Sequence, residues 1–288
     1  MATALLTGLV LGSIYILVGT GINLVHIATG AFNFAQAAVV MVGTFLASEL
    51  GVGAGLPTPV VILLAGAMGA LLGLLTEFVA IRPVAGKGLH GELVTTVGVS
   101  TILTGLVIVV WGTDVSPVNQ FISDRVVSIG SGRVTVDGLA VIAVAVSACV
   151  AFWAWSRLSM TGLAALALSE DRDAATLKGV NVRYLSVLAM AAAGAIGGAA
   201  GPIVGTQTLA VSTVAAVVIL KAFLVLIVGG MGSFPGLLVG GLIIGLIEAG
   251  AVRFLGSEYV TFVLFALLLV VLLARPQGLF GQKFERAV

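Results

Sequence analysis

Long apolar stretches dominate this sequence and constrain its fold more than any other feature. About 20 residues of α-helix, at about 1.5 Å rise each, span the roughly 30 Å hydrocarbon core of a bilayer. Two stretches, 33–50 and 213–230, are shorter or interrupted. The clearest apolar stretches cover residues 4–25, 58–80, 93–111, 137–156, 183–205, 233–252 and 259–274. The sequence therefore predicts an all-α, polytopic transmembrane helix bundle with about eight or nine membrane helices.

Composition agrees with lipid as the main solvent. Of 288 residues, 60% are hydrophobic and 9% are charged, whereas a soluble domain carries roughly 25% charged residues. The polar breaks are short, so we expect a single transmembrane domain over residues 1–288. Glycines recur at four-residue spacing, as at Gly8/Gly12 and Gly69/Gly73. In lipid this spacing favours close helix packing, and the alternative is that some glycines let helices slide or break during a conformational cycle.

Basic residues gather in three of the polar breaks. Cytoplasmic loops of membrane proteins are enriched in Lys and Arg, and alternating helices place these breaks on one face, which we expect to be cytoplasmic together with the C-terminus. The sequence does not indicate on which side of the membrane the N-terminus lies, because no basic residue flanks the first two helices. The residues concerned are Arg82, Lys87, Arg157, Arg172, Lys178, Arg183, Arg275, Lys283 and Arg286.

The longest polar break, residues 157–183, contains the signals of a short helix. Ser169 is a residue type that caps helix N-termini, acidic residues follow it where the helix dipole favours them, and Gly179 is a C-terminal stop. The pattern predicts a solvated helix of about ten residues over 169–179, held between two membrane spans.

This helix resembles a known motif. Asp173-Ala174-Ala175, followed after three residues by Gly179, is similar to the EAA…G pattern of importer permeases of the ATP-binding-cassette class. The resemblance implies that the helix docks in a groove of an ATPase and transmits its motion. It assigns ATPase coupling to Glu170, Asp171, Asp173, Ala174, Ala175, Lys178 and Gly179.

Three further segments share a wider resemblance. They read GSIY at 12–15 with GAFNFAQ at 30–36, KAF at 221–223 with VGGMGSFPG at 228–236, and RPQGLF at 275–280. In this order they resemble the branched-chain amino acid permease family, and its shorter, H-type subunit in particular. Ala37 and His26 depart from the family pattern, which bears on the substrate and not on the class.

The resemblance implies a complete importer in the cytoplasmic (inner) membrane of a bacterium or archaeon. A second, related permease, two ATPase subunits and an extracytoplasmic binding protein are the expected partners. ATP and Mg would bind to the ATPases, so no cofactor, metal or catalytic residue is expected in this chain. Relatives carry Leu, Ile, Val and other amino acids, and also urea or short amides.

Polar residues within the apolar stretches are costly and usually face a cavity or a partner. On a continuous helix, residues 26 to 36 would place several of them on one face, whereas a break at Gly30 would expose backbone groups near the midplane. Lys221 needs an acid, a carbonyl or water, and Glu77, Glu248 and a partner subunit are the candidates. We predict a substrate pathway, with bonding between neighbouring helices as the alternative, from Asn23, His26, Thr29, Asn33, Gln36 and Lys221.

Other function classes fit less well. A secondary transporter driven by an ion gradient is the main alternative, because Glu77 and Glu248 could couple protons or sodium, but it has no need for a helix at 169–179. The sequence has only two His, no G-x-S-x-G, no Walker A motif and no metal-ligand spacing, which argues against an enzyme. No Lys/Arg-rich run indicates nucleic acid.

Overall fold

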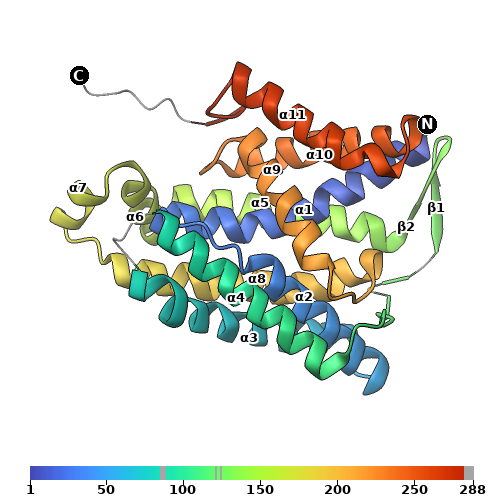
Figure 1. The fold of residues 1–288 in the computed structure, drawn as a ribbon, viewed down its shortest axis with the longest axis horizontal. Helices are drawn as coiled ribbons and strands as arrows, with labels where there is room; N and C mark the ends of the chain where they lie inside the picture. The colour runs from blue at the N-terminus through green and yellow to red at the C-terminus, as the bar shows by residue number, and fades with distance from the viewer. Residues whose placement is uncertain (85–88, 121, 124, 282–288) are drawn as a thin grey trace.

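The computed structural model describes residues 1–84, 89–120, 122–123 and 125–281. Its elements run nearly parallel to one long axis (Figure 1). Short π-helical turns, Ala47–Gly53 and Glu77–Ile81, prolong α2 and α3, and a 3₁₀ turn precedes α11. The helices are α1 Ala2–Thr29, α2 Gln36–Leu46, α3 Thr58–Thr76, α4 Leu89–Trp111, α5 Val136–Leu158, α6 Met160–Glu170, α7 Arg172–Leu177, α8 Val182–Thr208, α9 Val214–Gly229, α10 Phe234–Phe254 and α11 Val260–Ala274.

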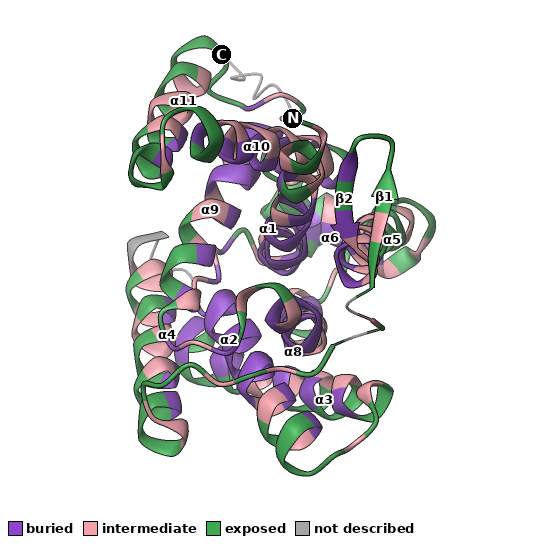
Figure 2. Cartoon of the chain, turned by 90° about the vertical axis from the view of Figure 1, so that its right-hand side faces the viewer, coloured by how far each residue is buried: buried purple, intermediate pink, exposed green. Residues whose placement is uncertain are grey.

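The predicted bundle is confirmed. Within the described residues, eight helices are long and apolar enough to cross a membrane, and α9 is a shorter apolar helix. Buried residues concentrate in α1, α2, α8 and α10 (Figure 2). The outer helices α3, α4, α5 and α11 instead expose large apolar side chains such as Leu63, Val109 and Leu273. Such a surface suits lipid, because a soluble protein rarely exposes a large continuous apolar area.

Glycine seams hold the central helices together. A Cβ atom on Gly69 of α3 would meet the carbonyl oxygen of Gly194 on α8, and one on Gly194 would meet that of Gly69. On the seam between α1 and α10, a Cβ atom on Gly12 would meet the carbonyl oxygen of Gly241, and one on Gly245 would meet that of Gly8. The packing role predicted for the four-residue glycine spacing is therefore confirmed for these pairs, since a side chain at any of them would separate the backbones.

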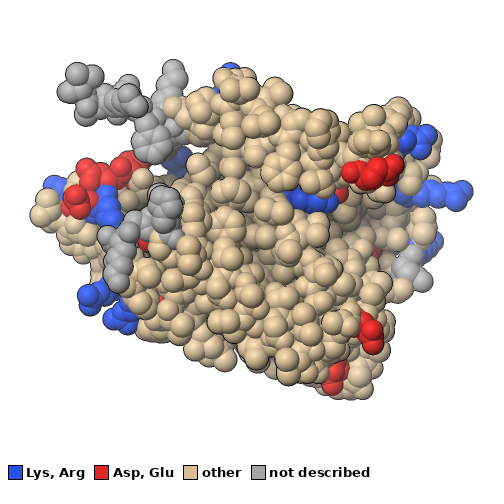
Figure 3. All heavy atoms as spheres, viewed as in Figure 1, with Lys and Arg blue, Asp and Glu red and all other residues tan. Residues whose placement is uncertain are grey.

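The two ends of the bundle differ in their elements. One end carries α6 and α7 with the ends of α3, α5 and α11, and the other carries a β-hairpin (Figure 1). Charged residues lie mostly at the two ends, and a broad apolar belt separates them (Figure 3). The predicted grouping of basic residues holds for the described ones, Arg82, Arg157, Arg172, Lys178, Arg183 and Arg275, at the α6–α7 end. Lys87, Lys283 and Arg286 lie outside the described residues.

The prediction of one helix over 169–179 is wrong. Residues 160–170 continue as α6, and Ser169 lies inside it, where its hydroxyl donates to the carbonyl of Leu166. Asp171 adopts an extended conformation and caps α7, because its Oδ1 accepts a hydrogen bond from the Ala174 amide at 2.9 Å. Aspartate is as good an N-cap residue as serine, and its local bond to the backbone competes with continuation of the helix. Gly179 does end the segment, in a left-handed conformation with φ 88°.

The continuous-helix alternative for residues 26–36 is also wrong. α1 ends at Thr29, and Gly30 follows with φ 76°, its amide bonded to the His26 carbonyl. Asn33 lies in the connection and Gln36 begins α2. The break at Gly30 is therefore the alternative that holds, because glycine adopts this conformation without steric cost.

The loop between α4 and α5 contains structure that was not predicted. Strand β1, Val126–Ile129, pairs antiparallel with β2, Gly132–Thr135, around a turn with Gly130 at φ 59°. Earlier in this loop, Ser116 and Ala210 exchange two backbone hydrogen bonds of 3.0 Å and tie it to the α8–α9 connection. There Leu209 has φ 60° and ψ 174°, a conformation that is strained for a residue with a side chain.

The C-terminal segment packs back on the end of α9. The amide of Leu279 donates to the carbonyl of Val228, and the amide of Phe280 donates to that of Gly229, both at 2.9 Å. The last carbonyls of a helix have no partner within it. The segment therefore supplies the donors that complete the C-terminus of α9.

Candidate functional site

Residues 30–35 form a re-entrant segment between α1 and α2. Ala31 and Ala35 are fully buried and Asn33 is nearly so. The Asn33 side chain accepts a hydrogen bond from the Ala35 amide at 3.0 Å, and the Asn33 carbonyl accepts one from Gln36. The polar backbone of the segment is thus partly satisfied by Asn33, which is what allows an irregular stretch to lie inside an apolar bundle.

The polar residues around this segment have partners in several helices. Asn23 accepts a hydrogen bond from the Gly232 amide at 2.9 Å, and Gln36 donates to the Ala193 carbonyl at 2.8 Å. Thr29 donates to the Val25 carbonyl of its own helix. These contacts join α1, α2, α8 and the α9–α10 connection, so each side chain has a structural partner whatever its part in transport.

Three buried polar atoms around the segment keep unused hydrogen-bonding capacity. Within the described residues, Asn23 Nδ2, His26 Nδ1 and Gln36 Oε1 have no hydrogen-bond partner. A buried polar group left unpaired costs free energy. These atoms are therefore suited to a water molecule or a polar solute, and the assignment of a substrate pathway to them stays a prediction.

An aromatic cluster connects the re-entrant segment to α9. The Phe32 ring stacks on His26 with centroids 4.6 Å apart. Phe223 of α9 meets the edge of Phe32 at 5.6 Å and lies 5.3 Å from Phe34. The three phenylalanines were not predicted as site residues, although all lie within the GAFNFAQ and KAF motifs. A displacement of the segment would therefore meet α9 directly.

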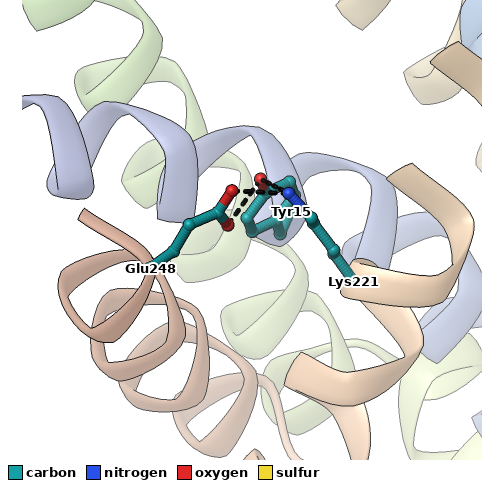
Figure 4. A network of polar contacts seen from close by, with 3 residues as sticks. All are labelled: Tyr15, Lys221 and Glu248. Atoms are coloured by element: carbon teal, nitrogen blue, oxygen red, sulfur yellow. Dashed lines mark hydrogen bonds and ion pairs between the residues drawn. The ribbon is translucent and has the colours of Figure 1, made fainter. Parts of the chain in front are cut away.

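Lys221 lies in a charged network between three helices (Figure 4). Its ammonium donates to Glu248 Oε1 at 2.5 Å and to the Tyr15 hydroxyl at 3.2 Å, and that hydroxyl donates to Glu248 Oε2 at 2.8 Å. Of the candidate partners, the structure selects Glu248 of α10 and not Glu77. Tyr15 of α1 was missed, because nothing in the sequence relates it to residues more than 200 positions away.

The two charged residues of the network differ in exposure, because Glu248 is nearly buried and Lys221 is partly exposed through an opening at the surface. The Glu248 side chain is 7% exposed and the Lys221 side chain is 18% exposed. A charged spot in the middle of the apolar belt is visible over this region in Figure 3. Since a lysine ammonium at membrane depth is poorly tolerated in lipid, this opening is better suited to a polar path or to a partner protein.

The residues predicted to couple to an ATPase form a projection at one end of the bundle, beyond the end of α1 (Figure 1). Ala175 is buried and packs with Leu168 and Leu185. Leu177 is 88% exposed, so the projection presents an apolar side chain among charged ones. This exposed residue was not predicted. The other coupling residues are exposed, namely Glu170, Asp171, Asp173, Ala174, Lys178 and Gly179.

Comparisons with known proteins agree with this architecture. The family model described as branched-chain amino acid transport system, permease component, matches residues 4–272. The high-affinity branched-chain amino acid transport system permease protein LivH of Salmonella typhimurium is 31% identical over 288 residues, which cover 96% of this chain and 94% of the relative. LivH of Escherichia coli K12 has the same identity and coverage. BraD of Pseudomonas aeruginosa is 28% identical over 291 residues, covering 96% of this chain and 95% of the relative. The chain therefore belongs to the branched-chain amino acid transport permease family.

Proposed function

We propose that this chain is one of two permease subunits in an ATP-driven importer for branched-chain amino acids or related small polar solutes. The observation that carries the proposal is the α6–α7 projection, which presents Asp173, Leu177 and Lys178 to solvent beyond the end of the bundle. A docked ATPase would bury this leucine behind the surrounding charged residues, and an apolar centre with a polar rim is the usual composition of a protein interface.

The arrangement supports a direction for the subunit in the membrane. The described basic residues at the α6–α7 end favour a cytoplasmic location for that end by the positive-inside tendency, and α11 ends on the same side of the bundle. ATPase subunits that bind ATP and Mg would dock on the projection. A second permease would cover the Lys221 opening, and an extracytoplasmic binding protein would deliver the solute to the end that carries the β-hairpin.

In this proposal the re-entrant segment and the Lys221 network border the solute path. Asn23, His26 and Gln36 have unused polar atoms there, as a site for a zwitterionic or amide solute requires. Lys221 pairs with Glu248, which leaves that carboxylate poorly suited to bind and release a coupling ion. An ion-gradient mechanism would therefore depend on Glu77, whose buried Oε2 has no hydrogen-bond partner among the described residues.

Co-purification in mild detergent, followed by ATPase and uptake assays in proteoliposomes, tests the proposal. Gly179→Val changes the end of α7, and Gly130→Val is the matched control, because both glycines have positive φ and open space around them. We expect an ATPase and a second permease to copurify with the wild-type chain, and Gly179→Val alone to release the ATPase and abolish uptake. A chain that purifies alone and moves leucine in response to an ion gradient would refute the importer.

A further inference from the structure

Arg172 connects the α6–α7 projection to the membrane core. It is the first residue of α7, and its Nη1 donates to the carbonyl of Thr29 at 3.3 Å, across 143 positions of sequence. Thr29 is the last residue of α1. In Figure 1 the projection and this end of α1 lie together. Arg172 did not belong to the predicted coupling residues.

The contact is placed where a cation is favourable. The final carbonyls of α1 have no partner within the helix, and the C-terminal end of a helix dipole attracts positive charge. Only the Gly30 amide turns back, to the His26 carbonyl. The Arg172 guanidinium therefore holds the exact point at which α1 ends and the re-entrant segment begins.

Arg172 is fixed to α7 at its other end. The Asp171 carboxylate caps the helix through the Ala174 amide, so the backbone of Arg172 moves with the helix that follows it. Ala175 is the buried residue of α7 and packs against Leu168 and Leu185. The described contacts of α7 thus include an apolar one to α6 and α8 and a polar one to α1.

Beyond Thr29 the chain leads directly to the candidate path. The Phe32 carbonyl accepts a hydrogen bond from Thr96 of α4, and its ring packs on His26 and Phe223. Within three residues of the Arg172 contact, the segment therefore contacts α1, α4 and α9. These helices are the ones whose relative displacement would open or close a path beside the segment.

We propose that Arg172 is a positioning residue that transmits movement of α7 to the re-entrant segment through the Thr29 carbonyl. This inference rests on the proposed function, because an ATPase must move α7. Arg172 acts through Thr29 and does not contact solute. Its loss would leave the ATPase docked and active while solute movement becomes uncoupled from ATP hydrolysis.

Variants of the assembled transporter in proteoliposomes test the inference. Arg172→Gln removes the charge and Arg172→Lys keeps it. Glu92→Gln is the matched control, since Glu92 interacts electrostatically with Arg172 but takes no part in the Thr29 contact. Each complex is assayed for copurified ATPase, for ATP hydrolysis, and for solute imported per ATP. A second readout is the maleimide labelling rate of Phe34→Cys in a Cys149→Ala background, with and without a non-hydrolysable ATP analogue.

For Arg172→Gln we expect wild-type ATPase content and hydrolysis, with about a tenfold fall in solute imported per ATP. The nucleotide-dependent change in labelling at position 34 disappears, while Arg172→Lys and Glu92→Gln retain both readouts. Two results overturn the inference: an Arg172→Gln complex with wild-type coupling, or one that has lost its ATPase, which would make Arg172 a docking residue. A wild-type complex without ATP-dependent uptake instead refutes the proposed function.

Discussion

The buried network of Tyr15, Lys221 and Glu248 offers a quantitative test of how the helices are held together. Glu248→Leu removes the acceptor of both a lysine ammonium and a tyrosine hydroxyl. Hydrogen bonds to charged groups contribute about 1.5–3 kcal/mol each, so the loss of two amounts to about 3–6 kcal/mol. Independently of this sum, removal of one partner of a buried ion pair lowers the free energy of unfolding by about 3–5 kcal/mol. Because Lys221 retains some exposure, we expect the lower part of this range, about 3 kcal/mol.

The double variant Lys221→Met/Glu248→Leu distinguishes the effect of an unpaired buried charge from the effect of losing the polar network. It leaves no unpaired charge, and apolar replacement of both partners is often nearly neutral, so we expect a loss of about 1 kcal/mol, mostly from the Tyr15 hydroxyl. The losses of stability in the single variants Glu248→Leu and Lys221→Met should therefore sum to much more than the loss in the double variant.

The chain contains its own probe for this experiment. Cys149 is the only cysteine and is buried, so a thiol-reactive fluorophore reports unfolding on heating. At roughly 2 °C per kcal/mol for a chain of this size, Glu248→Leu should melt several degrees below the wild type and the double variant close to it. A Glu248→Leu protein that melts with the wild type, or a double variant as unstable as the single one, would refute this reasoning.

Three further changes test other parts of the structure. Gly69→Val on the α3–α8 seam should lower the free energy of unfolding by about 1–3 kcal/mol through overpacking. Gly105→Val, in open space on α4, should leave the melting temperature reported by Cys149 unchanged. Equal effects of the two changes would contradict close packing at the seam. Leu209→Gly should raise that temperature, because it relieves strain of about 1–3 kcal/mol, and a decrease would mean that the Leu209 side chain contributes more than the strain costs. Asp171→Ala should remove the α7 cap, worth about 1 kcal/mol, and speed hydrogen exchange of residues 172–177 about fivefold, which the same change at the exposed Asp173 should not do.

The membrane helices were predictable because lipid imposes a strong and local rule on sequence. A helix must be apolar over its whole length, so the spans can be read with errors of a few residues, as for 58–80 against the observed Thr58–Thr76 with its π-helical extension. Gly179 was predicted as a helix end, and a break at Gly30 was one of two alternatives, for the same local reason, since the positive φ of both residues suits glycine.

Features that depend on competition or on distance were not predictable in this way. Ser169 and Asp171 are both good caps, and the choice of Asp171 follows from α6, which continues through residue 170. Glu248 was one of three candidate partners predicted for Lys221, beside Glu77 and a partner subunit. The contact with Tyr15 could not be predicted, because it depends on the three-dimensional packing of α1 against α9 and α10. The contact of Arg172 with Thr29 likewise joins two segments that no periodicity relates.

The return of the C-terminal segment to α9 has a consequence for biogenesis. Leu279 and Phe280 bond to carbonyls of Val228 and Gly229, so the end of α9 lacks these donors until about 50 further residues have been synthesised and α10 and α11 have entered the bilayer. During that interval the α9–α10 corner is exposed as an unfinished helix end. Completion of this corner can therefore serve as a check that translation has passed Phe280, and a polypeptide terminated before this residue would present an incomplete corner to membrane proteases.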